Sequence, residues 1–156
     1  MREKQSASGD MWNSQSSKPR IFISGPIQGM EEDQSYRDAI RKICEHHGFK
    51  PIDPWLREKV LYRMENISQP CGSEFFDFIK RDLEDIERCD ILVAYLPRLS
   101  AGTCMELFYA KLKGKKTVTI CGIENPSPWI VAHSDVILRR IEELDDYLKK
   151  NQRLLT

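Results

Sequence analysis

Short runs of apolar residues alternate along the chain with longer stretches in which apolar residues recur every three or four positions. Three runs predict buried strands, at Arg20–Ser24, Asp90–Leu96 and Lys116–Cys121. Two shorter runs, at Phe49–Asp53 and Asp135–Leu138, predict further strands. Because unbroken apolar runs are typical of strands covered on both faces, the pattern predicts a parallel sheet of about five strands.

The stretches between these strands have helical periodicity. The predicted helices are Gln34–His47, Leu56–Tyr62, Phe75–Cys89, Thr103–Leu112 and Arg140–Asn151. Gly48 closes the first as a C-cap, and a loop containing Pro70 and Gly72 follows the second. Strands alternating with helices predict one α/β domain, Rossmann-like or flavodoxin-like, with helices on both faces of the sheet.

Three loops follow the first three predicted strands: GPIQGM, DPW and PRLSAGT. In a parallel sheet the carboxyl ends of the strands form one rim, and ligands bind beyond that rim. Gly25 and Gly29 in the first loop allow the backbone to approach a ligand closely. We therefore expect a binding site where these loops meet.

The composition of the chain limits which classes of binding partner are expected. The 156 residues carry 24 Lys and Arg against 24 Asp and Glu, so the formal net charge is zero, and neither a nucleic-acid polymer nor an anionic membrane is expected as a partner. No apolar run reaches the length of a membrane span. The Ser-rich polar residues 1–18 predict a disordered tail, which leaves one domain over residues 19–156.

The five cysteines are scattered and odd in number, which favours a reduced, cytoplasmic setting over a disulfide framework. Cys44, His46 and His47 lack the spacing of a metal site, so no metal is expected. A helix N-terminus would lower the pKa of the Cys104 thiol, but no His lies nearby in the sequence, so Cys104 is a weak alternative nucleophile.

Asp82 interrupts an apolar stripe. On a helix over Phe75–Cys89, the residues that share its side are Phe75, Phe78, Ile79, Ile86 and Cys89. An inward-facing carboxylate costs several kcal/mol, roughly, unless it is hydrogen-bonded or neutralised. Two interpretations stay open: Asp82 is a functional acid, or it lies near a helix end and accepts hydrogen bonds from a loop backbone.

Glu106 follows a Gly-containing loop and the most apolar strand. Thr103 and Glu106 fit a capping box, which needs no activity. Equally, a carboxylate in the first helical turn at the ligand rim is kept ionised by the helix dipole, as a nucleophile requires. Two carboxyls across a pocket, one ionised and one carrying a proton, are the arrangement that glycosidic chemistry uses.

Three segments, RIFISGPIQGM, RDLEDIERCDILVAYLP and SAGTCMELFYAKLKGKK, resemble the nucleoside 2-deoxyribosyltransferase superfamily, which includes 2'-deoxynucleoside 5'-phosphate N-hydrolases. The resemblance covers roughly Arg20 to Asp135. It implies a Rossmann-like domain that cleaves the N-glycosidic bond of a nucleoside or nucleotide. It also implies that Glu106 is the nucleophile of a glycosyl-enzyme intermediate and that Asp82 handles the proton at the base.

The resemblance also bears on the substrate. Ser100, six residues before Glu106, matches the phosphate-contacting Ser of the nucleotide hydrolases. Gln28 stands where their phosphate loop has an arginine, which weakens the phosphate assignment. Phe22 stands where the family tends to have a Tyr that orients the nucleophile, a role that Tyr36 or Tyr95 would have to take.

The segment from Asn125 to Asp135 resembles the family region that reaches into a neighbouring subunit, which implies a homodimer or larger even assembly. Asn125 or Ser127 would then lie near the partner's substrate. The alternative is a Pro-rich surface turn with Trp129 as a core anchor. Trp55 belongs in the core or lines the base pocket.

The leading hypothesis is an enzyme for deoxyribosyl transfer or hydrolysis, without metal or organic cofactor, on a nucleoside or nucleoside 5'-monophosphate. A nucleotide-sensing module with little turnover and a structural protein remain alternatives. Besides Glu106 and Asp82, the predicted site residues are Ser24, Gly25, Ile27, Gln28, Gly29, Ser100, Gly102, Trp55, Asn125 and Ser127.

Overall fold

The sheet of the computed structural model contains five parallel strands in the order β2-β1-β3-β4-β5. The structure describes residues 17–62 and 73–155, so the predicted tail and the loop containing Pro70 and Gly72 lie largely or wholly outside the described residues. The strands are β1 (Arg20–Ser24), β2 (Lys50–Ile52), β3 (Ile91–Leu96), β4 (Lys116–Cys121) and β5 (Val136–Leu138). This order confirms the predicted flavodoxin-like α/β fold.

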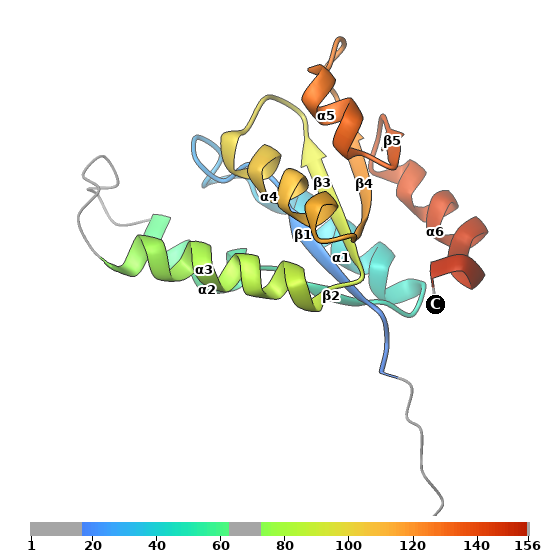
Figure 1. The fold of residues 1–156 in the computed structure, drawn as a ribbon, viewed down its shortest axis with the longest axis horizontal. Coiled ribbons are helices and arrows are strands. Elements are labelled where there is room, and N and C mark those ends of the chain that lie inside the picture. The colour runs from blue at the N-terminus through green and yellow to red at the C-terminus, as the bar shows by residue number, and fades with distance from the viewer. Residues whose placement is uncertain (1–16, 63–72, 156) are drawn as a thin grey trace, which may run out of the picture.

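Helices cover both faces of the sheet (Figure 1). The helices are α1 (Ser35–His46), α2 (Trp55–Tyr62), α3 (Ser73–Arg88), α4 (Ala101–Leu112), α5 (Pro128–His133) and α6 (Glu142–Leu155). On one face α1 and α6 pack Ile40 and Leu144 against the strands. On the other face α3, α4 and α5 bury Ile86, Leu107 and Ile130. The strands are apolar throughout because each contributes to both layers.

Several elements differ from the sequence prediction in their boundaries, and one helix was not predicted. The strand predicted at Phe49–Asp53 is shorter, because Phe49 precedes β2 in the core and Asp53 follows it. Helix α4 begins at Ala101 instead of Thr103, since Ser100 is its N-cap. Helix α5 is not among the helices predicted from the sequence, because six residues that begin with a proline are too few to show periodicity.

None of the described helices is both long and apolar enough to span a membrane. The four described cysteines are free thiols, in line with the absence of a disulfide pattern in this part of the sequence. Gly48 adopts φ +81° immediately after the cap residue His47, where a glycine closes a helix at little cost.

Candidate active site

A cavity of about 890 Å³ opens beyond the carboxyl ends of β1 and β3. The strand order reverses at this point, because β2 is added on one side of β1 and β3 on the other, so the loops after β1 and β3 diverge and leave a crevice. Gly25 and Gln28 of the first loop, Pro54 after β2, and Arg98 and Ser100 after β3 all line this crevice. The three rim loops predicted from the sequence therefore meet here.

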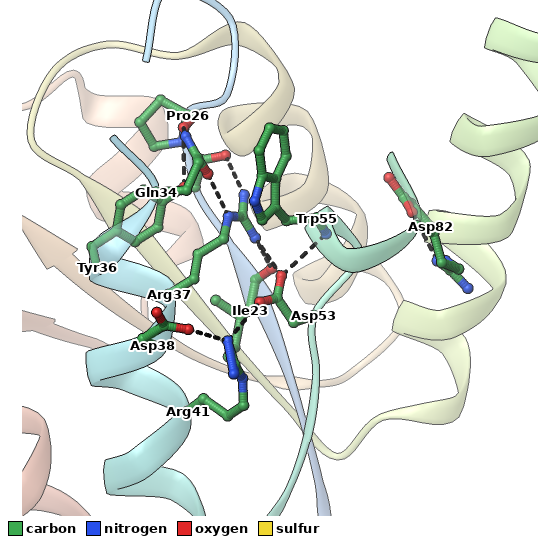
Figure 2. A network of polar contacts seen from close by, with 12 residues as sticks. Ile23, Pro26, Gln34, Tyr36, Arg37, Asp38, Arg41, Asp53, Trp55 and Asp82 are labelled. Carbon is green, nitrogen blue, oxygen red and sulfur yellow. Dashed lines mark hydrogen bonds and ion pairs between the residues drawn. The ribbon is translucent and has the colours of Figure 1, made fainter. Parts of the chain in front are cut away.

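Asp82 lies in the middle of α3, with only 4% of its surface exposed, and lines the cavity. This placement confirms its inward orientation and excludes the interpretation that it accepts hydrogen bonds near a helix end. Arg57 Nη2 donates a hydrogen bond of 3.2 Å to Asp82 Oδ1 and lies 2.7 Å from Asp85 Oδ2. Figure 2 shows Asp82 on a neighbouring helix, apart from the polar network around Arg37.

The predicted apolar stripe of α3 is only partly inward. Phe78, Ile86 and Cys89 are buried with Asp82, but Ile79 is 47% exposed and contributes instead to the cavity wall. The side chain of Phe75 lies outside the described residues.

Glu106 lies in the second turn of α4 and lines the same cavity. The capping-box interpretation is wrong, because the Ser100 Oγ, and not Thr103, accepts the hydrogen bond from the Thr103 backbone N–H at the start of the helix. A residue six positions after the cap is beyond the reach of a capping box. Capping therefore does not explain the position of Glu106.

Burial raises the pKa of Glu106 to about 8, and the negative charge of Asp82 acts in the same direction. The Ser24 hydroxyl and the Arg37 guanidinium oppose this rise. Ser24 Oγ is itself buried and has no regular hydrogen bond to the residues that the structure describes. The helix dipole alone, which the sequence suggested would keep Glu106 ionised, is therefore outweighed by desolvation.

A third carboxyl, Glu58 on α2, lines the cavity and was not predicted as a site residue. It is 2% exposed, and it hydrogen-bonds with Asp82. Burial, this hydrogen bond and the charges of Asp82 and Glu106 raise its pKa to about 10. The hydrogen bond in turn lowers the pKa of Asp82, although burial leaves that pKa raised overall. Both carboxyls therefore favour the protonated form, and the Arg57 guanidinium opposes this at Asp82.

Arg37 anchors the loop after β1. Its guanidinium donates to the carbonyls of Ile23 (3.3 Å) and Gly25 (3.1 Å) and pairs with Asp53 Oδ1 at 2.9 Å, as Figure 2 shows. Both side chains of this ion pair are 2% exposed, and Asp53 also accepts from the backbone N–H of Trp55. A single buried cation thus ties the ends of β1 and β2 to α1, beside the cavity.

Phe22, at the position where the resemblance implied a Tyr, is fully buried beneath α3 and α4. Tyr36 does not line the cavity. Burial raises the pKa of its phenol, and the negative charge of Glu106 adds to this rise. Its hydroxyl, however, donates to the Pro26 carbonyl at 3.0 Å. Tyr36 therefore holds the loop.

The cavity brings together half of the predicted substrate-binding residues: Gly25, Ile27, Gln28, Ser100 and Gly102. The other five lie outside its lining: Ser24, Gly29, Trp55, Asn125 and Ser127. Ser24 is buried and interacts with Glu106, and Trp55 is a buried core residue whose backbone N–H donates to Asp53. Asn125 is exposed and Ser127 caps α5, so neither reaches this chain's own cavity.

Arg98 is a second residue that the sequence did not single out. Its Nη2 donates to the Gln28 carbonyl at 2.5 Å, and its side chain lines the cavity. A cation therefore lies beside the first loop, although Gln28 fills the position where the resemblance implied an arginine. The only sequence signal was a charged residue in the loop after the most apolar strand.

Two lesser predictions are wrong. The helix N-terminus was expected to lower the pKa of the Cys104 thiol, but burial raises it. A thiol with a raised pKa is a poor nucleophile. Trp129 is 73% exposed and stacks on His133, so it is not a core anchor.

The sequence pattern of one enzyme family matches most of the chain. This family is nucleoside 2-deoxyribosyltransferase, and the match spans residues 21–139, which include Glu58, Asp82 and Glu106. The chain belongs to the nucleoside 2-deoxyribosyltransferase family. Membership in the nucleoside 2-deoxyribosyltransferase family indicates an enzyme of N-deoxyribosyl transfer or N-glycosidic bond cleavage. Among curated proteins, none matches the chain significantly.

Solved structures share the fold. A 2-deoxyribosyltransferase from Bacillus psychrosaccharolyticus aligns with a TM-score of 0.66 at 16% identity, covering 82% of this chain and 91% of that one. A CMP N-glycosidase from Clostridium botulinum aligns with a TM-score of 0.52 at 20% identity, covering 84% and 98%.

A CheY-like receiver domain from Methanospirillum hungatei also aligns, with a TM-score of 0.53 at 14% identity, covering 89% of this chain and 97% of that one. Such a protein has a different role on the same fold, so the similarity in structure describes architecture only. The activity has to be argued from the site.

Proposed function

We propose that the protein cleaves the N-glycosidic bond of a nucleoside or nucleoside 5'-monophosphate, by deoxyribosyl transfer or hydrolysis, through a glycosyl-enzyme intermediate on Glu106. The observation that carries the proposal is that Glu106 and Asp82, from α4 and α3, line one cavity at the switch point of the sheet. They are close enough for the charge of Asp82 to raise the pKa of Glu106.

The two acids have different tasks in this reaction. The Glu106 carboxylate attacks the anomeric carbon while the bond to the base nitrogen breaks, and Asp82 delivers a proton to the departing base. Attack requires an ionised Glu106, so its pKa of about 8 predicts a reactivity that increases from neutral to mildly alkaline pH. A second base or a water molecule then takes the sugar, which yields transfer or hydrolysis.

The phosphate of a 5'-monophosphate has a complementary position in this cavity. Arg98, the Ser100 hydroxyl and the N-terminus of α4 with Gly102 lie along the same wall. The Ser100 Oγ accepts hydrogen bonds from the Thr103 N–H and Oγ1, so its own proton can be donated to an anion. The loop residues Gly25, Ile27 and Gln28 complete the sugar side.

The experiment is an assay for free base over a panel of nucleosides and their 5'-monophosphates, with and without a second base as acceptor. Glu106→Ala and Asp82→Asn are each expected to abolish base release while retaining the folded circular-dichroism spectrum. The matched control is Glu45→Gln, which changes an exposed carboxyl on α1. Base release by Glu106→Ala at the wild-type rate would rule out Glu106 as the nucleophile.

A nucleotide-binding module with little turnover is the second candidate. It is favoured by one observation, the commitment of the Tyr36 hydroxyl to Pro26, which leaves Glu106 without a phenol to orient it. Binding of a 5'-monophosphate, measured by calorimetry, with no base released over the whole panel would favour the module over the enzyme.

A homodimer with shared sites is part of the proposal. Met105, Phe108 and Leu112 form an exposed apolar row on α4, and Trp129 on the adjoining α5 extends it. An apolar surface of this kind favours burial against a second copy, whose Asn125 and Ser127 would lie near the substrate.

Leu112→Asp tests the dimer, because Leu112 is exposed and does not line the cavity. Sedimentation equilibrium is expected to show a dimer for the wild type and a monomer with reduced activity for this variant. Lys149→Asp, on the exposed side of α6, is the control and is expected to remain dimeric. A monomeric wild type would contradict the shared site.

A further inference from the structure

Among the residues that the structure describes, Glu58 is the one buried acid at the cavity to which the proposed reaction gives no task. It projects from α2 into the same cavity as Asp82 and Glu106, with 2% of its surface exposed. Its Oε1 is buried and has no hydrogen-bond partner among the residues that the structure describes, although the carboxyl hydrogen-bonds with Asp82. A buried acid with an open acceptor position costs stability, which calls for a functional reason.

The contact between Glu58 and Asp82 can exist as a hydrogen bond only if one of the two carboxyls carries a proton. Arg57 decides which one, because its guanidinium donates to Asp82 and pairs with Asp85, and it thereby favours an ionised Asp82. The proton therefore belongs to Glu58 in the empty site. A buried pair of this kind titrates as one unit that holds a single proton.

The charged groups facing Glu58 support the same assignment. The groups are Arg57 on its own helix, Asp82 and Asp85 on α3, Glu106 on α4 and Arg37 on α1. Burial is the largest cause of the raised pKa of Glu58; repulsion by Asp82 and Glu106 adds to it, and the positive charge of Arg37 opposes it. The proton is thus retained at the pH where Glu106 is ionised for attack.

We propose that Glu58 is a positioning residue that stores, in its hydrogen bond to Asp82, the proton which Asp82 delivers to the departing base. This inference rests on the proposed N-glycosidic cleavage. In the first step Glu106 forms a bond to the anomeric carbon, and the bond from that carbon to the base nitrogen breaks. The electron pair of the broken bond leaves with the nitrogen, which takes up the proton of the Glu58–Asp82 pair. The water or base that next attacks the anomeric carbon returns its proton to the pair.

The assignment predicts a dependence on the leaving group. Glu58→Gln preserves size and a hydrogen-bond donor to Asp82, but an amide has no acidic proton to give. Release of an unprotonated base is therefore expected to slow by about 100-fold, as for the loss of a general acid. Release of a cationic base, such as that of an N7-methylated purine nucleoside, needs no proton and is expected to stay within about threefold of the wild type.

The pH profile provides the second measurement. The kcat/KM of the wild type on an ordinary base is expected to rise with the ionisation of Glu106 and to fall again near pH 10, where Glu58 loses its proton. The fall is expected to be absent in Glu58→Gln. Glu45→Gln, an exposed carboxyl on α1, is the control and is expected to keep the wild-type profile.

A third measurement does not depend on turnover. The infrared difference spectrum between wild type and Glu58→Gln at neutral pH is expected to show the carbonyl band of a protonated carboxyl. A spectrum containing only carboxylate bands overturns the inference, as does an equal loss of activity on both classes of base. If Glu106→Ala stays active, the proposed function fails, whereas an unaffected Glu58→Gln beside an inactive Glu106→Ala refutes only the role of Glu58.

Discussion

The phenol ring of Tyr36 occupies the space that a side chain at Gly25 would need. A Cβ built on Gly25 would lie 2.6 Å from Tyr36 Cε2 and 2.7 Å from Cζ. The ring cannot retreat easily, because it packs against Tyr95 with 4.4 Å between centroids and its hydroxyl is bonded to Pro26. Gly25 is therefore required for the close approach of the loop to α1, and so for one wall of the cavity.

The variant Gly25→Ala is expected to lose about 1–3 kcal/mol of unfolding free energy, as for an overpacked site, and to lose activity with it. Gly102→Ala is the matched comparison, since no atom lies within 4 Å of its Cβ position and it lies inside α4. The unfolding free energy of Gly102→Ala is expected to rise slightly, by about 0.5–1 kcal/mol. Urea denaturation of both variants measures the difference, and an equally stable Gly25→Ala would show that Tyr36 moves aside.

Arg98 is expected to distinguish nucleotides from nucleosides. Because its guanidinium is the cation beside the first loop, Arg98→Gln should weaken kcat/KM for a 5'-monophosphate at least tenfold, from the loss of a charge-assisted hydrogen bond, and leave the free nucleoside unaffected. The control is Arg88→Gln, an exposed arginine at the end of α3. An equal effect of Arg98→Gln on both substrates would place the phosphate elsewhere.

The stability of the protein should depend on pH through its buried acids. Glu106 has a folded pKa of about 8 against a normal value of 4.5, so the folded state binds more protons between these values. Its contribution is fully present below about pH 4.5 and is lost as pH rises toward 8. Glu58, at about 10, extends the loss to higher pH.

The variant Glu106→Gln removes this contribution, so its unfolding free energy relative to the wild type is expected to increase from pH 5 to pH 8. Chemical denaturation across that range measures the difference. A constant difference between the two proteins would show that the Glu106 carboxyl is ionised in the folded state throughout.

The sequence predicted the fold well because the strands reveal themselves locally. The run Ile91–Leu96 is apolar on both faces, and the turn glycine Gly48 closes its helix as expected. Asp82 was also predictable, because a helix has only one inward face and an acid on that face stands out. Both inferences depend on periodicity within a single element.

The rest of the site depends on contacts between elements. Glu58 occupies a short helix with a weak apolar pattern, and its proximity to Asp82 arises only when α2 packs beside α3. Arg98 meets Gln28 across 70 positions of sequence. Ser100 and Thr103 are both acceptable caps, and the sequence favoured the wrong one because Glu106 completed a capping box with Thr103.

The most direct test of the central proposal is to trap the sugar on the enzyme. In a 2'-fluoro-substituted arabinosyl nucleoside or its 5'-monophosphate, the fluorine slows both steps, because it destabilises the positive charge that develops at the anomeric carbon. A base that leaves readily keeps the first step the faster of the two, so the intermediate accumulates. Intact mass followed by peptide mapping is expected to place one fluoroglycosyl adduct on Glu106, with none in Glu106→Gln. An adduct on another residue, or base release by the wild type with no adduct on Glu106 at any time, would contradict it.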